Sequence, residues 1–345
     1  MPCGDQGDQT DSDTTSSGAA INLYGQECNL PSQPDVVFSH APTDLSDVIV
    51  INPTGAPNGG VIKPHSYLFL NDTAKQGQGA PVYAVADAWL TQVAFYGDEI
   101  TGGEYLLFFD VSCEVVYKFD HLTSVVASIE AVAPGLAAGS QTTPIDPPIF
   151  FAAGEVVGYS KGAQPHGGPF DFGAYHTGHL NSFANQERYE HADQSLHSVC
   201  PYDLFEEPLK SLMKSLYGGP GGQPGSPEAE CGVERDMAGT VAGAWFNETD
   251  PSDGNGFAIA LTADQMVMMT GDGQIDVRVG PGEATWKDPR SVTALQSGGL
   301  RRWCYQGWNG NYAYLELIDD MTLAVSSGAG QCPNSMPQEH QTFVR

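Results

Sequence analysis

The sequence has little positive charge and no long apolar run. Its 345 residues contain 14 Lys and Arg against 42 Asp and Glu, a formal net charge of −28 at pH 7, and no Lys or Arg precedes Lys63. This charge repels a phosphate backbone and an anionic membrane face, so we expect no nucleic-acid partner. No apolar stretch reaches the roughly 18 residues that span a bilayer. We therefore expect contact with a membrane only through a lipid.

The motifs of common catalytic sites are also missing. The sequence has no G-x-S-x-G, no H-E-x-x-H, no P-loop and no G-x-G-x-x-G between a strand and a helix, and no Cys or His cluster has zinc spacing. Asp/Gly-rich stretches at 250–256 and 272–276 offer oxygens to Ca²⁺ but do not follow the EF-hand spacing, so we interpret them as turns. We expect no bound metal and no cofactor.

Cys3 is separated from the other six cysteines by an acidic, Ser/Thr-rich segment. This start resembles that of mature bacterial lipoproteins, which implies Cys3 as the lipid attachment site; the alternative is a disordered terminus with an incidental Cys. Six cysteines at wide spacings favour disulfides and allow 15 pairings, among which we expect Cys304 with Cys332. The six are Cys28, Cys113, Cys200, Cys231, Cys304 and Cys332.

Short apolar runs bounded by Gly, Pro, Asn and Asp, such as Asp35–His40 and Phe257–Leu261, predict strands separated by turns along most of the chain. The fold class we predict is mainly β, with an antiparallel sheet or barrel-like first domain and a second, smaller β sandwich or barrel. Residues 1–22 should form a disordered tether, 23–217 the first domain with a helix at 207–217, and 229–345 the second domain. The Gly/Pro-rich segment 218–228 is the expected linker.

Three segments, in this order, carry a family resemblance. They are Pro81–Leu90, Tyr117–Leu122 with its Asp-His-Leu, and Ala153–Tyr159 followed by Gly-Pro-Phe-Asp-Phe-Gly at 168–173. Together they resemble the lysostaphin-type or LytM-like zinc peptidases, which cut peptide cross-links of the bacterial cell wall. The resemblance covers roughly residues 60–180 and implies a peptidase-type fold for the first domain.

The same resemblance implies that the zinc ligands are missing. The family holds zinc with the His and Asp of H-x-x-x-D and the second His of H-x-H, but here Phe170 and Phe172 stand at the two H-x-H positions. His65 is followed four residues later by Phe69 rather than an acid. Only His121 matches a family histidine. The resemblance places His121, Phe170, Asp171 and Phe172 in the groove left by the lost site.

These observations favour one interpretation and leave one rival. We expect a non-catalytic binding or scaffolding lipoprotein, exported to the bacterial periplasm or cell surface, whose partner is a peptide, a cell-wall fragment or another envelope protein. The rival is an active metal-dependent hydrolase with a relocated site. Its candidate ligands are His65, Asp72, His121 and His176.

Three further features stay open at this stage. Five histidines crowd into 166–197, with His176 and His179 at a spacing that is conceivable for a metal, although surface histidines are the simpler interpretation. Arg188 in an acidic chain is interpreted as paired with a neighbouring carboxylate. The aromatic residues around Cys304 form either the core of the second domain or a surface for sugars or a partner. They are Trp303, Tyr305, Trp308, Tyr312 and Tyr314.

Overall fold

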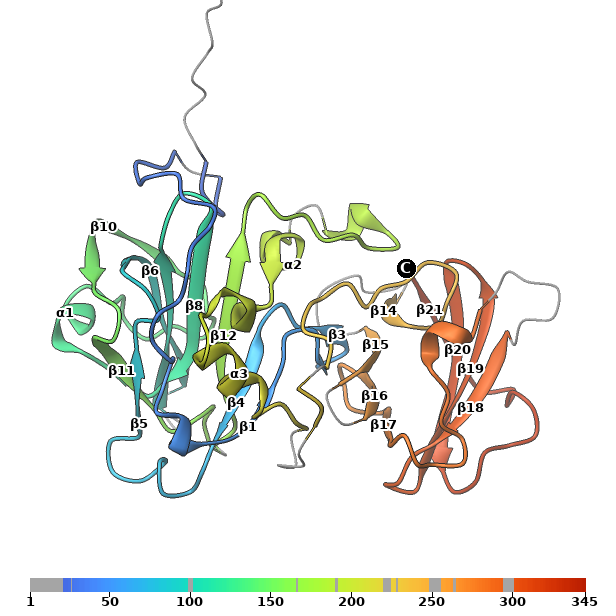
Figure 1. The fold of residues 1–345 in the computed structure, drawn as a ribbon. Helices are drawn as coiled ribbons and strands as arrows, with labels where there is room; N and C mark the ends of the chain where they lie inside the picture. Colours follow the sequence, from blue (N-terminus) through green and yellow to red (C-terminus); the bar gives the residue numbers. More distant parts are fainter. Residues whose placement is uncertain are drawn as a thin grey trace, which may run out of the picture.

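The computed structural model describes residues 21–25, 27–98, 102–165, 167–189, 192–219, 225–227, 229–247, 256–262, 265–293 and 301–345. Within these ranges the protein is mainly β, and all the pairings between its named strands are antiparallel, which confirms the predicted fold class. One group of sheets is built from residues 48–199 and another sheet from residues 243–344, and the two lie side by side (Figure 1).

The large sheet of the first group has the strand order β1-β4-β12-β8-β7-β6-β10, with β13 paired to β12. Its strands alternate apolar and polar residues, so one face is hydrophobic and the other mixed. The bounds are β1 Val48–Asn52, β4 Ser66–Leu70, β6 Ala88–Asp98, β7 Gly102–Asp110, β8 Val115–Leu122, β10 Thr143–Phe151, β12 Phe170–His176 and β13 Ser198–Val199.

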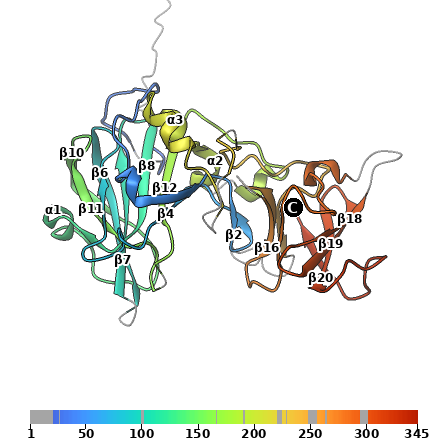
Figure 2. The same ribbon diagram turned by 60° about the horizontal axis from the view of Figure 1, so that its bottom comes forward.

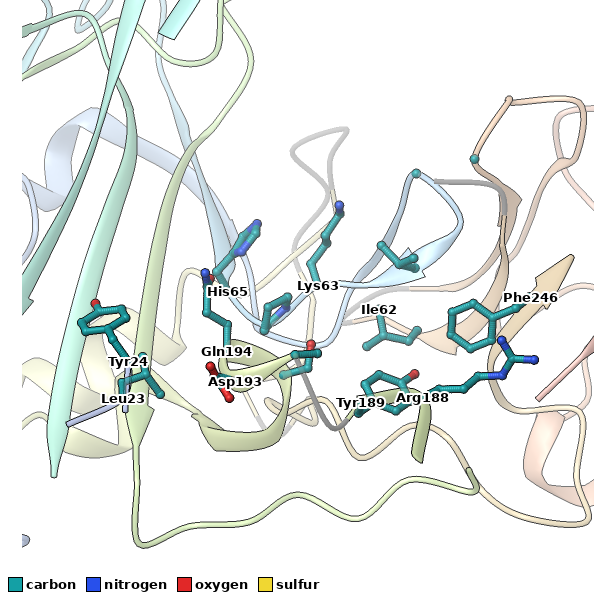
Figure 3. Close-up of a pocket in the computed structure, with 16 residues that line it drawn as sticks. Leu23, Tyr24, Ile62, Lys63, His65, Arg188, Tyr189, Asp193, Gln194 and Phe246 are labelled. Carbon is teal, nitrogen blue, oxygen red and sulfur yellow. The ribbon is translucent and has the colours of Figure 1, made fainter. Parts of the chain in front are cut away.

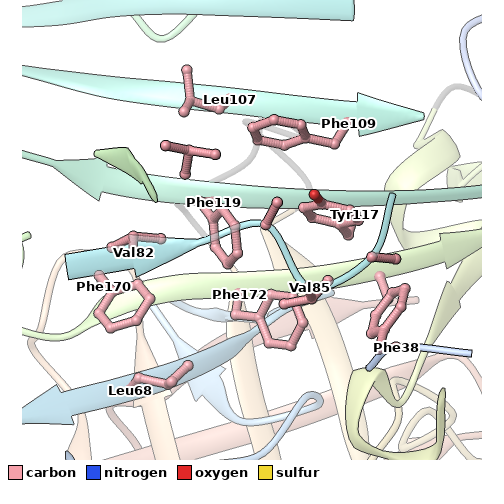
Figure 4. Close-up of a cluster of buried hydrophobic side chains, with 14 of the residues drawn as sticks. Phe38, Leu68, Val82, Val85, Leu107, Phe109, Tyr117, Phe119, Phe170 and Phe172 are labelled. Carbon is pink, nitrogen blue, oxygen red and sulfur yellow. The ribbon is translucent and has the colours of Figure 1, made fainter. Parts of the chain in front are cut away.

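A three-stranded sheet covers the hydrophobic face of the large sheet. It has the order β5-β11-β9, with β5 Ala80–Tyr83, β11 Val156–Ser160 and β9 Ser124–Val125. Figure 4 shows Val82 of this sheet facing Phe119 and Phe170 of the large one, within a core that also holds Phe38 and Phe172. Aromatic rings pack against each other in this core. Phe119, for example, stacks on Phe172 with ring centroids 5.4 Å apart.

The opposite face of the large sheet is apolar at one end only. There Leu23 and Tyr24, from the first described segment, pack against Phe108 and Tyr175. The disulfide between Cys28 and Cys113 ties this segment to the sheet, with a Cα–Cα distance of 5.6 Å. The other end of the same face carries the polar residues described in the next subsection.

The C-terminal sheet has eight strands in the order β17-β16-β15-β14-β21-β20-β19-β18 and is nearly closed. Its outer strands meet where the backbone N–H of Trp308 donates to the carbonyl of Arg278 (3.1 Å). The interior is filled by Trp245, Phe257 and Tyr305 among others. The bounds are β14 Gly243–Asn247, β15 Phe257–Leu261, β16 Met266–Thr270, β17 Asp276–Val279, β18 Arg302–Gln306, β19 Asn311–Asp319, β20 Thr322–Ala329 and β21 Gln341–Val344.

The expected pair Cys304–Cys332 is confirmed in this sheet. The aromatic residues around Cys304, which we expect to form either a core or a binding surface, are divided between buried and exposed positions. Tyr305 is fully buried, whereas Trp308 is 62% exposed. Part of the set is therefore core and part is surface.

The helices are few and short: α1 Ala127–Glu130, α2 Asp193–His197 and α3 Leu209–Lys214. α3 lies inside the helix predicted at 207–217, with Pro208 at its start, and buries Met213. None of the helices in the described part of the chain has the length and apolar character needed to cross a bilayer.

A hairpin joins the N-terminal sheets to the C-terminal sheet, and a disulfide crosses the expected linker. The hairpin β2 Pro57–Asn58 and β3 Val61–Ile62 reaches the C-terminal sheet (Figure 2), where Ile62 packs with Phe246 and Ala258. The disulfide Cys200–Cys231 connects residues on either side of the expected linker. The linker boundary itself stays a prediction, because 220–224 and 228 lie outside the described residues, as do residues 1–20 of the expected tether.

Candidate functional site

A row of polar side chains crosses the mixed face of the large sheet. Strand register places Asp171 on β12 opposite Tyr67 on β4 and Asp120 on β8, and it places Glu104 on β7 opposite Tyr96 on β6. The three carboxylates are buried, and the Tyr96 hydroxyl donates to Asp120 Oδ1 (2.6 Å). The row therefore concentrates negative charge in one partly enclosed place.

His121 reaches this row through an irregular backbone. Its φ of +65° is left-handed, and the pairing of β7 with β8 shifts register here, between Tyr105 and Leu107. Regular alternation would place His121 on the side of Phe119, but after the irregularity it is Leu122 that joins the hydrophobic core. The backbone N–H of His121 donates to Asp120 Oδ1 (2.8 Å) and its carbonyl accepts from Ser160 Oγ (2.7 Å), so hydrogen bonds hold this conformation.

The His121 imidazole lies between two carboxylates. Its Nδ1 is 2.8 Å from Glu104 Oε2 and its Nε2 is 3.7 Å from Asp171 Oδ2. Burial alone would lower the pKa of His121, but the hydrogen bond to Glu104 and the charges of Asp171 and Asp120 outweigh it and raise the pKa to about 9. His121 is therefore a cation at neutral pH, and it donates to Glu104.

Asp171 also contacts a second imidazole. His65 Nε2 lies 3.0 Å from Asp171 Oδ2, and burial, with the nearby charge of Lys118, lowers the pKa of His65. Burial would raise the pKa of Asp171, but His65, His121 and Lys118 together lower it. We conclude that a neutral His65 donates its Nε2–H to an ionised Asp171.

Gly173 provides the space for His65. A Cβ at this position would lie 2.7 Å from the Tyr175 hydroxyl and 3.1 Å from the Cβ of His65. Both are closer than such contacts normally approach, so a side chain at residue 173 would displace His65 from Asp171.

The arrangement offers ligand atoms to a metal ion, but only one of them is an imidazole nitrogen. One ligand atom each from Asp120, His121 and Asp171 lie within 4.8 Å of one another, and His65 is not part of this set. In the described part of the chain, Asp171 Oδ1 and His65 Nδ1 are buried without a partner. The set is one imidazole and two carboxylates, whereas the peptidase family uses two His and one Asp.

The structure brings together only part of the predicted alternative metal set. His65 and His121 lie on either side of Asp171, but Asp72 is exposed in the turn after β4. His176 is opposite Val115, six residues along β8 from His121, or about 20 Å at 3.3 Å per residue. The predicted four-residue set does not form, because β12 and β8 run extended between these positions.

Phe170 and Phe172 do not share a surface with His121 and Asp171. Both rings are fully buried in the hydrophobic core, while Asp171 points to the opposite face of β12. The expectation that all four residues line one groove is therefore wrong for the two phenylalanines. His121 and Asp171 remain candidate site residues.

The other histidines of segment 166–197 make local hydrogen bonds where the structure describes them. His176 Nδ1 accepts from the Gly178 N–H (3.0 Å), His179 Nε2 lies 3.0 Å from Asn181 Oδ1, and His197 Nδ1 lies 2.7 Å from the His179 carbonyl. His166 and His191 lie outside the described residues. The described members favour the surface interpretation.

A cleft of about 760 Å³ lies next to His65 and was not anticipated from the sequence. It runs between the segment after β3 and Phe246 of β14, with residues 188–189 and 192–195 forming a further wall (Figure 3). Its volume falls within the roughly 300–1,000 Å³ typical of ligand sites. Glu104, Asp120 and Tyr96 were missed as well, because their meeting depends on strand register, which short sequence motifs do not encode.

Comparisons with known proteins add little to this description. No protein-family model and no curated protein matches the chain. Among solved structures, it is similar to the antimicrobial peptidase lysostaphin from Staphylococcus simulans, with 13% identity, a TM-score of 0.28, and coverage of 84% of this chain and 95% of that chain. An NMR solution structure of lysostaphin gives 12% identity, a TM-score of 0.25, and coverage of 94% and 90%. We base no argument on similarities this low.

Proposed function

We propose that this protein is a non-catalytic cell-envelope protein, built on a degenerate peptidase fold, that binds or scaffolds a peptide, a cell-wall fragment or another envelope protein. The observation that carries the proposal is the position of His121. This family-matching histidine lies between Glu104 and Asp171, with Nδ1 2.8 Å from Glu104 Oε2 and Nε2 3.7 Å from Asp171 Oδ2, on the sheet face opposite Phe170 and Phe172.

The chemistry of that arrangement does not favour a catalytic zinc. A zinc ligand must donate a lone pair, which a phenyl ring does not possess, and at His121 zinc would first have to displace the proton that Glu104 and Asp171 favour. Without the metal there is no activated water at neutral pH, and His121 by itself supplies no substitute.

The disulfides support an exported protein. Cys28–Cys113, Cys200–Cys231 and Cys304–Cys332 persist only in an oxidising compartment such as the periplasm or the cell exterior. We further propose that a lipid on Cys3 anchors the chain, with the tether between the lipid and the first described residue.

The test combines a metal measurement with a cleavage assay. The purified full chain is dialysed against zinc and then against buffer, and bound metal is counted by elemental mass spectrometry. Release of amines from cell-wall peptides is followed with and without a chelator. We expect substoichiometric zinc and no chelator-sensitive release, with the same result for His121→Asn.

One observation supports a second candidate function, that of a metal-dependent hydrolase with a relocated site. Asp120, His121 and Asp171 offer three ligand atoms in one place, and a metal ion can displace the proton of His121. One zinc per chain, with chelator-sensitive cleavage that disappears in Asp171→Asn, would establish this candidate and overturn the non-catalytic proposal.

A further inference from the structure

The cleft beside His65 has an unusual charge for this protein. Among the described residues, its lining includes the cations Lys63 and Arg188 and one acid, Asp193. His65 lies at the other end of the cleft from Arg188 (Figure 3). In a chain with a net charge of −28, a cleft with this balance favours an anionic ligand.

Arg188 is the most distinctive residue of the cleft. Its guanidinium carbon lies 4.7 Å from the centroid of the Phe246 ring, and its Nε is buried without a partner. Within the described ranges no carboxylate pairs with Arg188, so the predicted ion pair is not found there. Four other arginines do pair with acids: Arg235 with Glu230, Arg278 with Asp276, Arg290 with Asp288 and Arg345 with Asp236.

The surroundings of Arg188 are apolar and well packed. Tyr189 stacks on Phe183 with ring centroids 3.7 Å apart and meets Phe246 edge-on, and Ile62 belongs to the same cluster. An arginine laid on an aromatic ring keeps its planar edge available for a two-point hydrogen bond to a carboxylate. An apolar group of the ligand has Ile62 and Phe246 to contact beside it.

We propose that this cleft binds the C-terminal carboxylate of a short peptide, with Arg188 donating hydrogen bonds to the carboxylate and Lys63 contributing to the positive lining. The inference rests on the proposed binding function and specifies its ligand. The planar guanidinium of Arg188 presents two N–H groups side by side, which match the two oxygens of a carboxylate. The cleft has room for the last few residues of a peptide, whose apolar side chains contact Ile62 and Phe246.

The experiment compares free and blocked carboxylates on the full chain. Two pools of N-acetylated pentapeptides, randomised at each position, are made as free acids and as C-terminal amides. Each pool is mixed with the protein in buffer containing chelator, the complex is separated by size exclusion, and retained peptides are counted by mass spectrometry. We expect at least tenfold more peptide from the acid pool than from the amide pool.

Substitutions of Arg188 test whether this residue causes the preference for peptides with a free carboxylate. Arg188→Met should remove the acid preference while keeping contact with Phe246, and Arg188→Lys should retain part of it because the charge remains without the planar fork. Arg278→Met is the matched control, since it removes a paired arginine from the C-terminal sheet and should bind like the wild type. Thermal unfolding of each variant confirms that it is folded.

Equal retention from both pools, no retention from either, or unchanged retention in Arg188→Met would overturn the inference. These outcomes differ from failure of the proposed function, which appears as zinc-dependent shortening of cell-wall peptides when the chelator is left out.

Discussion

The charge state of His121 gives the sharpest quantitative prediction. Its pKa is about 9 in the folded protein, whereas an unperturbed histidine titrates near 6.5. A raised folded pKa contributes stability that is fully present below about pH 6.5 and is lost as pH rises through about 9. Since a tenfold difference in proton affinity is about 1.4 kcal/mol, this contribution is about 3 kcal/mol for a side chain that is 25% exposed.

The groups that face His121 define the pH range in which its contribution to stability is lost. Glu104, Asp120 and Asp171 face the imidazole directly, together with the Tyr96 hydroxyl. Asp171 titrates below this range because its pKa is lowered, and Tyr96 titrates above it because burial, with Asp120, raises its pKa.

The assay is urea unfolding at pH 6.5, 7.5, 8.5 and 9.5 in the presence of a chelator. Cys3→Ser serves as the background, because a free thiol exchanges with disulfides at high pH. His121→Asn is the comparison, since Asn tolerates the left-handed backbone of this position. The free energy of unfolding of the parent should exceed that of the variant at pH 6.5, and this difference should shrink by about 3 kcal/mol by pH 9.5.

A difference between parent and variant that is constant over this pH range would refute the reasoning. Proton NMR of the imidazole provides an independent check, and a His121 midpoint near 6.5 would show that Glu104 does not hold the proton.

Three other predictions follow from the fold. Limited proteolysis should cut within 218–228, and the two fragments should separate on a gel only after reduction, because Cys200–Cys231 crosses the cut; separation without reductant would contradict the disulfide. Phe172→Ala should destabilise the protein by about 3–5 kcal/mol in urea unfolding, since its ring is fully buried. Mass spectrometry of the native envelope protein should find a diacylglycerol-modified Cys3 at the N-terminus, and an unmodified Cys3 would exclude the lipid.

Much of the strand pattern could be predicted from local sequence. The run Phe257–Leu261 coincides with β15, because its apolar residues are bounded by turn-forming clusters. The strand predicted at Asp35–His40 is wrong, since only Phe38 makes an isolated bridge, to Phe205. Prolines on both sides of that run leave too little chain for a ladder.

Strand β10, Thr143–Phe151, contains three prolines, which strands normally disfavour. It forms the edge of the large sheet, where a missing N–H is tolerated. The register breaks between Pro144 and Ile149, which is how the ladder accommodates the intervening prolines. A local rule cannot tell an edge strand from a central one.

The candidate site depends on a single backbone irregularity that the motif did not reveal. On β8 the side chains of Tyr117 and Phe119 enter the core and those of Lys118 and Asp120 face away, so a regular strand would send His121 into the core. The left-handed φ of His121 reverses this and directs Leu122 inward instead. The sequence predicted the identity of the histidine but not the face it occupies.

The two phenylalanines and the turned histidine are physically consistent with each other. Phe172 stacks on Phe119 and packs against Phe38, which fills the volume next to the H-x-H positions with hydrocarbon. A charged imidazole in that volume would be desolvated without a partner, at a cost far greater than that of a left-handed residue. On the opposite face, Glu104 and Asp171 provide the partners. The two phenylalanines and the His121 imidazole therefore lie on opposite faces of the sheet, and each face provides the neighbours that its side chains need.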